Sequence, residues 1–204
     1  MMDFERIASN ERARRARSLS NSRALYAGAG ETLREIAAQS LIVMCYAHWE
    51  GFFNFCVDLY IEAVNDAGKE IVQLNPALLA CEIEPHLMSL RDRNFRIDAR
   101  PDFARQVLAL SNYKRIGSDH SILKAASNLD FSRLRSCLNA LDVDEHRLLS
   151  HQNFIVHELV KWRHQVAHGD DPDLRTADLI NHSHRAEELL TIVLEIFSDR
   201  VARF

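Results

Sequence analysis

Three side chains in one short stretch of the last quarter of the chain have the chemistry to act on a phosphodiester. Arg163, His164 and His168 all fall within residues 161–170. An arginine guanidinium holds a phosphate through two parallel hydrogen bonds and offsets charge that develops in a transition state. A histidine exchanges a proton near neutral pH and can act as a general acid or base. We therefore look for a functional site in this stretch.

A helical pattern positions these side chains. Apolar residues recur at helical spacing on two adjoining strips, Leu148, Ile155, Leu159, Trp162 and Val166 on one and Leu149, Val156, Val160 and Ala167 on the other. The pattern predicts one helix from about His146 to His168. Gly169 is predicted to end this helix in a left-handed conformation, which leaves His168 in the last turn.

Arg163 falls on the second apolar strip, where a guanidinium loses solvation unless a carboxylate or an anionic ligand faces it. The pattern over residues 31–67 offers a partner, because polar side chains recur there four residues apart: Tyr46, Glu50, Asn54, Asp58 and Glu62. Glu50 lies deepest in the apolar part of that segment. We consider a Glu50–Arg163 pair, with a solvent-facing Glu50 as the alternative.

A metal site is the competing interpretation of the histidines. His157, His164 and His168 are spaced by seven and four residues, so on one helix they project from a single side and can surround zinc. The predicted helix end, however, turns the ring of His168 away from the other two. We therefore expect no metal and no other cofactor.

Arg163 and His168 form an Arg-x4-His motif, followed by Gly169. Two other stretches accompany the motif in order along the chain, Leu41–Phe53 and Ala126–Leu134. Together the three resemble the HEPN superfamily of all-α domains, many of whose members are metal-independent endoribonucleases. The chain departs from the family in one place, with His164 where many members have Asn.

The resemblance implies an endoribonuclease of a prokaryotic toxin or defence system, with Arg163 and His168 as catalytic residues. His164 would be a second titrating group or phosphate contact, and Glu50 a supporting carboxylate. RNA, a second copy of the chain across a twofold axis, and an antitoxin or defence-system protein are the implied partners. The alternative is a catalytically inactive HEPN module that binds RNA, a nucleotide or a partner protein. Asp170 stands where some toxins of the family carry a tyrosine, and transfer of nucleotides to that tyrosine silences the toxin, so we do not expect that control here.

Composition limits the partners further. The formal net charge of −4 gives no overall attraction for nucleic acid, so RNA contacts must be local. The one basic concentration is the first helical segment, with Arg14, Arg15 and Arg17, which we interpret either as a solvated helix or as an arm that contacts phosphates. Four cysteines without a CxxC pair are expected to be reduced thiols: Cys45, Cys56, Cys81 and Cys137. No apolar run approaches the roughly 20 residues that cross a bilayer, so we expect a cytoplasmic protein without membrane contact.

Residues 1–204 are predicted to form a single HEPN-like domain, an all-α bundle. Its parts are a basic N-terminal helix over 1–28, core helices over 31–67 and 146–204, and an irregular insert over 68–127 with short helices at about 76–90 and 102–112. A weak strand signal lies at residues 95–97. Asn128 or Asp130 is predicted to cap the helix that follows the insert.

An excess of aromatic residues predicts an interface. Trp162 lies beside the motif arginine, and Tyr46, Trp49 and Phe53 span more than one face of the second helix. One small helical core need not bury all of this aromatic surface. We therefore expect part of it to form a twofold contact between protomers.

Overall fold

The computed structural model describes residues 3–68, 70, 76–110, 123–125, 128–170, 172, 174 and 177–204. Its elements are α1 (Phe4–Gly28), α2 (Glu31–Ala67), α3 (Pro76–Asp92), α4 (Arg100–Leu110), α5 (Phe131–Leu141), α6 (His146–Leu149), α7 (Gln152–Phe154), the π-helical segment η3 (Ile155–Val160), α8 (Lys161–Ala167) and α9 (Leu179–Val201). These described parts contain no strand. The predicted all-α class is confirmed.

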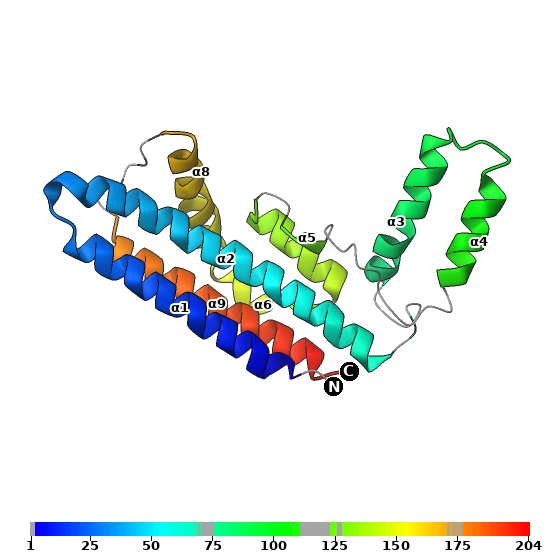
Figure 1. Ribbon diagram of the computed structural model, residues 1–204, viewed down its shortest axis with the longest axis horizontal. Helices are drawn as coiled ribbons and strands as arrows, with labels where there is room; N and C mark the ends of the chain where they lie inside the picture. Colours follow the sequence, from blue (N-terminus) through cyan, green and yellow to red (C-terminus); the bar gives the residue numbers. More distant parts are fainter. Residues whose placement is uncertain are drawn as a thin grey trace.

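Three long helices, α1, α2 and α9, lie side by side and form the body of the molecule (Figure 1). Helix α1 runs opposite to the other two, so the chain begins and ends at the same end of the body. Aspartate side chains start α1, α5 and α9 by accepting a hydrogen bond from a backbone N–H three residues on: Asp3, Asp130 and Asp178. The sequence therefore marks where these helices begin. Of the two predicted caps of α5, Asn128 and Asp130, the structure has Asp130.

Helix α2 is the centre of the core, because neighbours cover it on several sides. Phe53 and Tyr60 of α2 meet Phe197 of α9 edge to face, with ring centroids 6.0 and 5.8 Å apart. Tyr46 and Trp49 are also buried. The expectation that aromatic residues of this helix form an interface between protomers is therefore wrong, since one chain buries them itself.

The polar line along α2 fastens the segment that precedes α5. Asn54 Oδ1 accepts a hydrogen bond from the N–H of Ala125 at 2.9 Å, and Asp58 pairs with Lys124 at 2.5 Å. Tyr46 binds the same segment at Leu129. These polar side chains of α2 therefore bind described residues that precede α5.

Helices α3 and α4 pack on each other as a hairpin that projects from one end of α2 (Figure 1). The connection between them contains two residues with left-handed backbone, Asn94 (φ 51°) and Phe95 (φ 53°). Two such residues in succession cannot continue an extended strand. The strand signal at residues 95–97 was thus wrong. The predicted helix over 102–112 is α4, which begins earlier, and residues 111–112 lie outside the described parts.

The predicted helix from His146 to His168 is broken into α6, α7, η3 and α8. A turn at residues 150–151 separates α6 from α7, and the π-helical segment follows directly. A π-helix has a wider turn than an α-helix, so side chains beyond it are rotated from their expected direction. The prediction of one continuous helix was wrong, but its end was right, since Gly169 has φ 79°.

The four cysteines are free thiols, three of them buried. Within the described residues, no helix has the length and apolar character needed to span a membrane.

Candidate functional site

The motif histidines lie together at the exposed end of α8. The rings of His164 and His168 have centroids 4.3 Å apart and are tilted by 54°. The backbone N–H of His168 donates to the carbonyl of His164 at 3.1 Å, which holds the two residues one helical turn apart. Both side chains are exposed, so two imidazoles face solvent at one place.

Arg163 lies against α2 rather than in solvent. It is half-buried, and its guanidinium carbon lies 4.6 Å from the centre of the Tyr46 ring, the geometry of a cation–π contact. The Tyr46 hydroxyl accepts a hydrogen bond from the N–H of Leu129 at 2.6 Å and donates one to Oδ1 of Asn128 at 3.2 Å. Tyr46 therefore serves as a fixed platform for the arginine.

Glu50 follows Tyr46 by one turn of α2 and is half-buried. Burial raises the pKa of Glu50, while the Tyr46 hydroxyl and the charge of Arg163 act in the opposite direction. Burial also raises the pKa of Tyr46 to about 12, which keeps its hydroxyl neutral. Glu50 and Arg163 are both described residues and form no direct ion pair, so the expected pairing is wrong as a contact. The two charges still interact across Tyr46.

A second cluster, which the sequence did not reveal, packs behind the motif. His182 of α9 is buried between Trp162 and Phe154, with ring centroids 4.9 and 5.2 Å away. Glu158 of η3 accepts a hydrogen bond from Arg185 at 3.0 Å and lies 3.7 Å from Nδ1 of His182. Trp162 precedes the motif arginine, so this cluster joins the motif helix to α9.

The metal interpretation gains no support from the geometry. Within the parts of the chain that the structure describes, no three histidine, cysteine or acidic side chains gather at distances suited to a metal ion. His157 lies in η3, before the change of helical register, while His164 and His168 follow it. Because the π-helical turn is wider, His157 no longer shares one side of the helix with His164 and His168, as the spacing predicts for a continuous α-helix.

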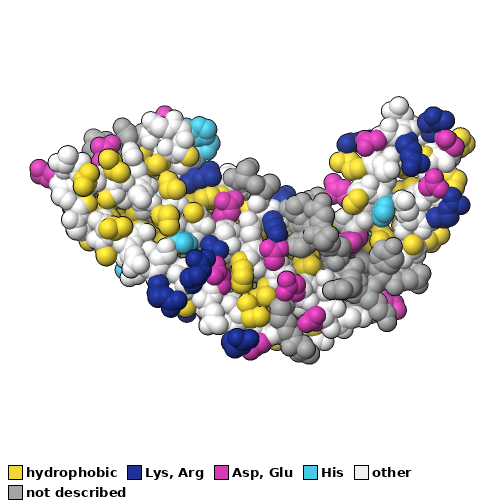
Figure 2. Space-filling view, in the orientation of Figure 1, with side chains coloured by type: hydrophobic (Ala, Val, Ile, Leu, Met, Phe, Trp, Pro, Cys, Tyr) yellow, Lys and Arg dark blue, Asp and Glu magenta, His cyan; other side chains and the backbone are white. Residues whose placement is uncertain are grey.

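The basic residues of α1 are not part of this cluster. Helix α2 lies between α1 and α8 (Figure 1), and dark-blue side chains gather over α1 away from the cyan histidines at α8 (Figure 2). Arg15 is only 14% exposed, pairs with Glu11 at 2.7 Å and lies over Gly51, where an added Cβ would come within 2.6 Å of its Nη1. Arg14 and Arg17 are exposed, although Arg14 also binds Glu11.

An all-α bundle with Arg-x4-His at an exposed helix end defines the class of this protein. Residues 4–204 match the family model described as HEPN_MAE_28990-like HEPN, and the chain belongs to this HEPN family. Neither the curated proteins nor the solved structures gave a match. The resemblance read from the sequence is thereby confirmed. Membership supports an RNA-related role, with nuclease activity as a possibility common to HEPN domains.

Proposed function

We propose that this protein is a metal-independent endoribonuclease of a toxin or defence system. The observation that carries the proposal is the geometry at the end of α8. Arg163 is held on Tyr46, and His164 and His168, whose exposed rings are 4.3 Å apart, belong to the same end of α8. Phosphate binding and proton transfer are then available at one place.

RNA cleavage without a metal needs three actions. One group removes the proton of a 2′-hydroxyl, whose oxygen attacks the adjacent phosphorus, and another group protonates the departing 5′-oxygen. A cation offsets the additional negative charge on the phosphoryl oxygens. We assign the proton transfers to His168 with His164, and the phosphate to Arg163. The products are a 2′,3′-cyclic phosphate and a 5′-hydroxyl.

Glu50 orients Arg163 in this proposal. Its charge interacts with the guanidinium across Tyr46 without a direct ion pair. The guanidinium can therefore form its two parallel hydrogen bonds with a phosphate instead of a carboxylate. Arg14 and Arg17, two exposed arginines of α1, are proposed to contact RNA phosphates outside the cleavage site.

A homodimer is part of the proposal, and exposed apolar side chains of α2 support it. Leu33, Ile36 and Val43 are 61%, 64% and 37% exposed, and they recur at helical spacing on a face that continues to Glu50. A second copy that covers this face would bring the two motif helices close together. Ile36→Asp should give a monomer by light scattering, whereas Leu108→Asp, at a 70% exposed position of α4, should not.

The experiment compares the wild type with Arg163→Ala and His168→Ala on total RNA and tRNA in EDTA. Both variants should lose cleavage and any growth toxicity while keeping their circular dichroism, because both side chains lie at the end of α8 and outside the buried core. His146→Ala, an exposed histidine in α6, is the matched control. Cleavage by His168→Ala at the wild-type rate would contradict the proposal.

The second candidate is an inactive HEPN module that binds RNA, a nucleotide or a partner protein such as an antitoxin. The position that favours it is His164, which departs from the Asn found in many members. RNA that is bound by the wild type but never cut, with the same affinity in His168→Ala, would favour this candidate over the nuclease.

A further inference from the structure

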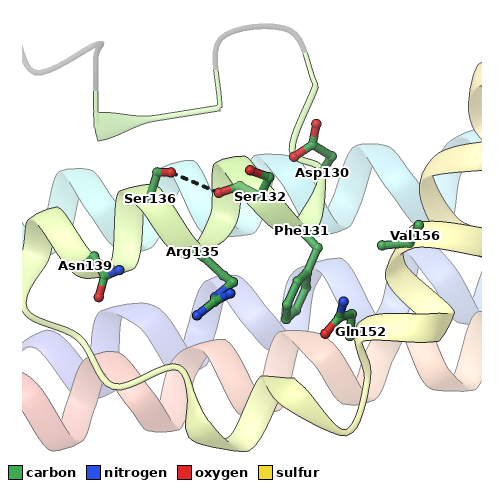
Figure 3. Close-up of a pocket in the computed structure, with 8 residues that line it drawn as sticks. All are labelled: Asp130, Phe131, Ser132, Arg135, Ser136, Asn139, Gln152 and Val156. Atoms are coloured by element: carbon green, nitrogen blue, oxygen red, sulfur yellow. Dashed lines mark hydrogen bonds between the residues drawn. The ribbon is translucent and has the colours of Figure 1, made fainter.

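A groove of about 690 Å³ lies between α5 and the helical run that leads to the motif. Its walls are the exposed side of α5, α7 and the start of η3 (Figure 3). Phe131 and Arg135 of α5 point toward Gln152 of α7, and Val156 of η3 faces them from the side. The groove extends along α5 to Asn139, about 12 Å beyond Phe131 at the rise of an α-helix. One or two nucleotides can occupy this length.

The lining favours an uncharged polar ligand over a phosphate. Arg135 and Asp130 are the charged members of the described lining, and their formal charges cancel. Nε of Arg135 also donates to Glu145 at 2.7 Å, which offsets its charge further. Asp130 lies at the edge and would repel a phosphate. A nucleobase fits this balance better than the sugar–phosphate chain does.

The hydrogen-bonding groups match the edge of a purine. Nε of Arg135 donates its hydrogen bond to Glu145, and the two Nη atoms of Arg135 have no partner among the described residues. The exposed amide of Gln152 likewise has none there. Arginine and glutamine side chains are the usual readers of guanine and adenine edges, through N7 and the neighbouring exocyclic group. Phe131, 5% exposed, and Val156 supply an apolar floor for the base.

Two connections place the groove next to the motif. Val156 precedes Arg163 by seven residues, which corresponds to about 10 Å along a helical run. On the other wall, Asp130 follows Asn128 by two residues, and Asn128 accepts the hydrogen bond from the Tyr46 hydroxyl. Tyr46 in turn carries Arg163. A strand of RNA bound at Arg163 therefore has its neighbouring base within reach of the groove.

We propose that this groove is a subsite for a purine base of single-stranded RNA, next to the phosphate bound at Arg163. The inference rests on the proposed nuclease function and adds the part of the site that selects sequence. Arg135 and Gln152 read the base edge, and Phe131 with Val156 supports its face. Cleavage then falls preferentially beside a purine.

Binding is measured first, in the inactive His168→Ala protein, so that the test does not require cleavage. Fluorescently labelled RNA tetranucleotides that differ only in one base are titrated by anisotropy. A purine should bind roughly tenfold more tightly than a pyrimidine, the discrimination expected of one well-placed base contact. Adding Gln152→Ala, or Arg135→Lys, should reduce this ratio toward one. Arg135→Lys keeps the positive charge but lacks the planar fork.

Asn153→Ala is the matched control, since Asn153 is the exposed neighbour of Gln152 and is not part of the lining. It should keep the wild-type ratio. Equal affinity for all four bases, or an unchanged ratio in Gln152→Ala and Arg135→Lys, would overturn the subsite. In the otherwise wild-type protein, the same variants should cut at a broader set of positions. Base-selective binding without any cleavage would instead reject the nuclease and keep the subsite.

Discussion

His182 offers a quantitative test of the cluster that holds the motif helix to α9. It is 1% exposed, and neither ring nitrogen has a hydrogen-bond partner among the described residues. Burial lowers the pKa of His182 to about 4, and the positive charge of Arg185 adds to the shift. The Glu158 carboxylate, 3.7 Å from Nδ1, does not outweigh burial.

Proton binding at this position makes the free energy of unfolding depend on pH. Below the ordinary histidine pKa of 6.5, the unfolded chain binds a proton at this position, whereas the folded protein stays neutral until about pH 4. Protons therefore favour the unfolded state, and stability falls as pH falls through this window. At ~1.4 kcal/mol per unit of pKa difference, the loss is ~2 kcal/mol between pH 7 and pH 5 and ~3 kcal/mol by pH 4.

His182→Phe removes this proton site and keeps a ring between Trp162 and Phe154. It also removes two buried nitrogens without partners, worth ~1 kcal/mol or more at pH 7. Urea unfolding at several pH values should therefore show that the variant has the higher free energy of unfolding. Its difference from the wild type should grow by ~2 kcal/mol from pH 7 to pH 5. His184→Phe makes the same change at an exposed position of α9. A difference in free energy of unfolding between His182→Phe and the wild type that stays constant with pH would refute the reasoning.

The composite cleft, the Tyr60 hydroxyl and the arginines of α1 can each be tested by substitution. Mixing His168→Ala with Arg163→Ala protein should restore part of the cleavage activity if one cleft takes its groups from both protomers; a monomer at micromolar concentration by light scattering would exclude such a cleft. Tyr60→Phe should lower the free energy of unfolding by ~1 kcal/mol, because its hydroxyl donates a buried 2.8 Å hydrogen bond to a carbonyl at the end of α5; an unchanged urea midpoint would contradict this. Arg15→Ala should lower the melting temperature. Arg17→Ala should leave the melting temperature unchanged and weaken RNA binding, more at low salt than at high salt. A lower melting temperature in Arg17→Ala but not in Arg15→Ala would contradict the assignment of Arg15 as buried and Arg17 as exposed.

Local rules were enough to predict much of this fold from the sequence. The apolar pattern predicted core helices within residues 31–67 and 146–204, where α2 and α9 lie, because a helix that packs in a core must place apolar side chains on the covered side. The basic segment over residues 1–28 was predicted as the helix that is α1. Gly169 marked the end of α8, since its left-handed backbone costs glycine little. The Arg-x4-His spacing, with two accompanying stretches, pointed to the HEPN family.

The tertiary structure decided what each polar group contacts. Sequence spacing suggested Glu50 as the partner of Arg163, but the guanidinium lies on the ring of Tyr46. The way α8 crosses α2 determines this contact. The π-helical segment broke the expected continuous helix, and no short pattern in the sequence marks a turn that is one residue wider.

His182 and the groove beside α5 were likewise invisible in the sequence. His182 reads as one more polar position of α9, and only the packing of Trp162 and Phe154 around it makes it buried. The groove joins Arg135 to Gln152, which belong to different helices. The physical reason is the same in each case. Periodicity reports which side of a helix is covered, whereas a contact between two helices depends on their crossing and relative rotation.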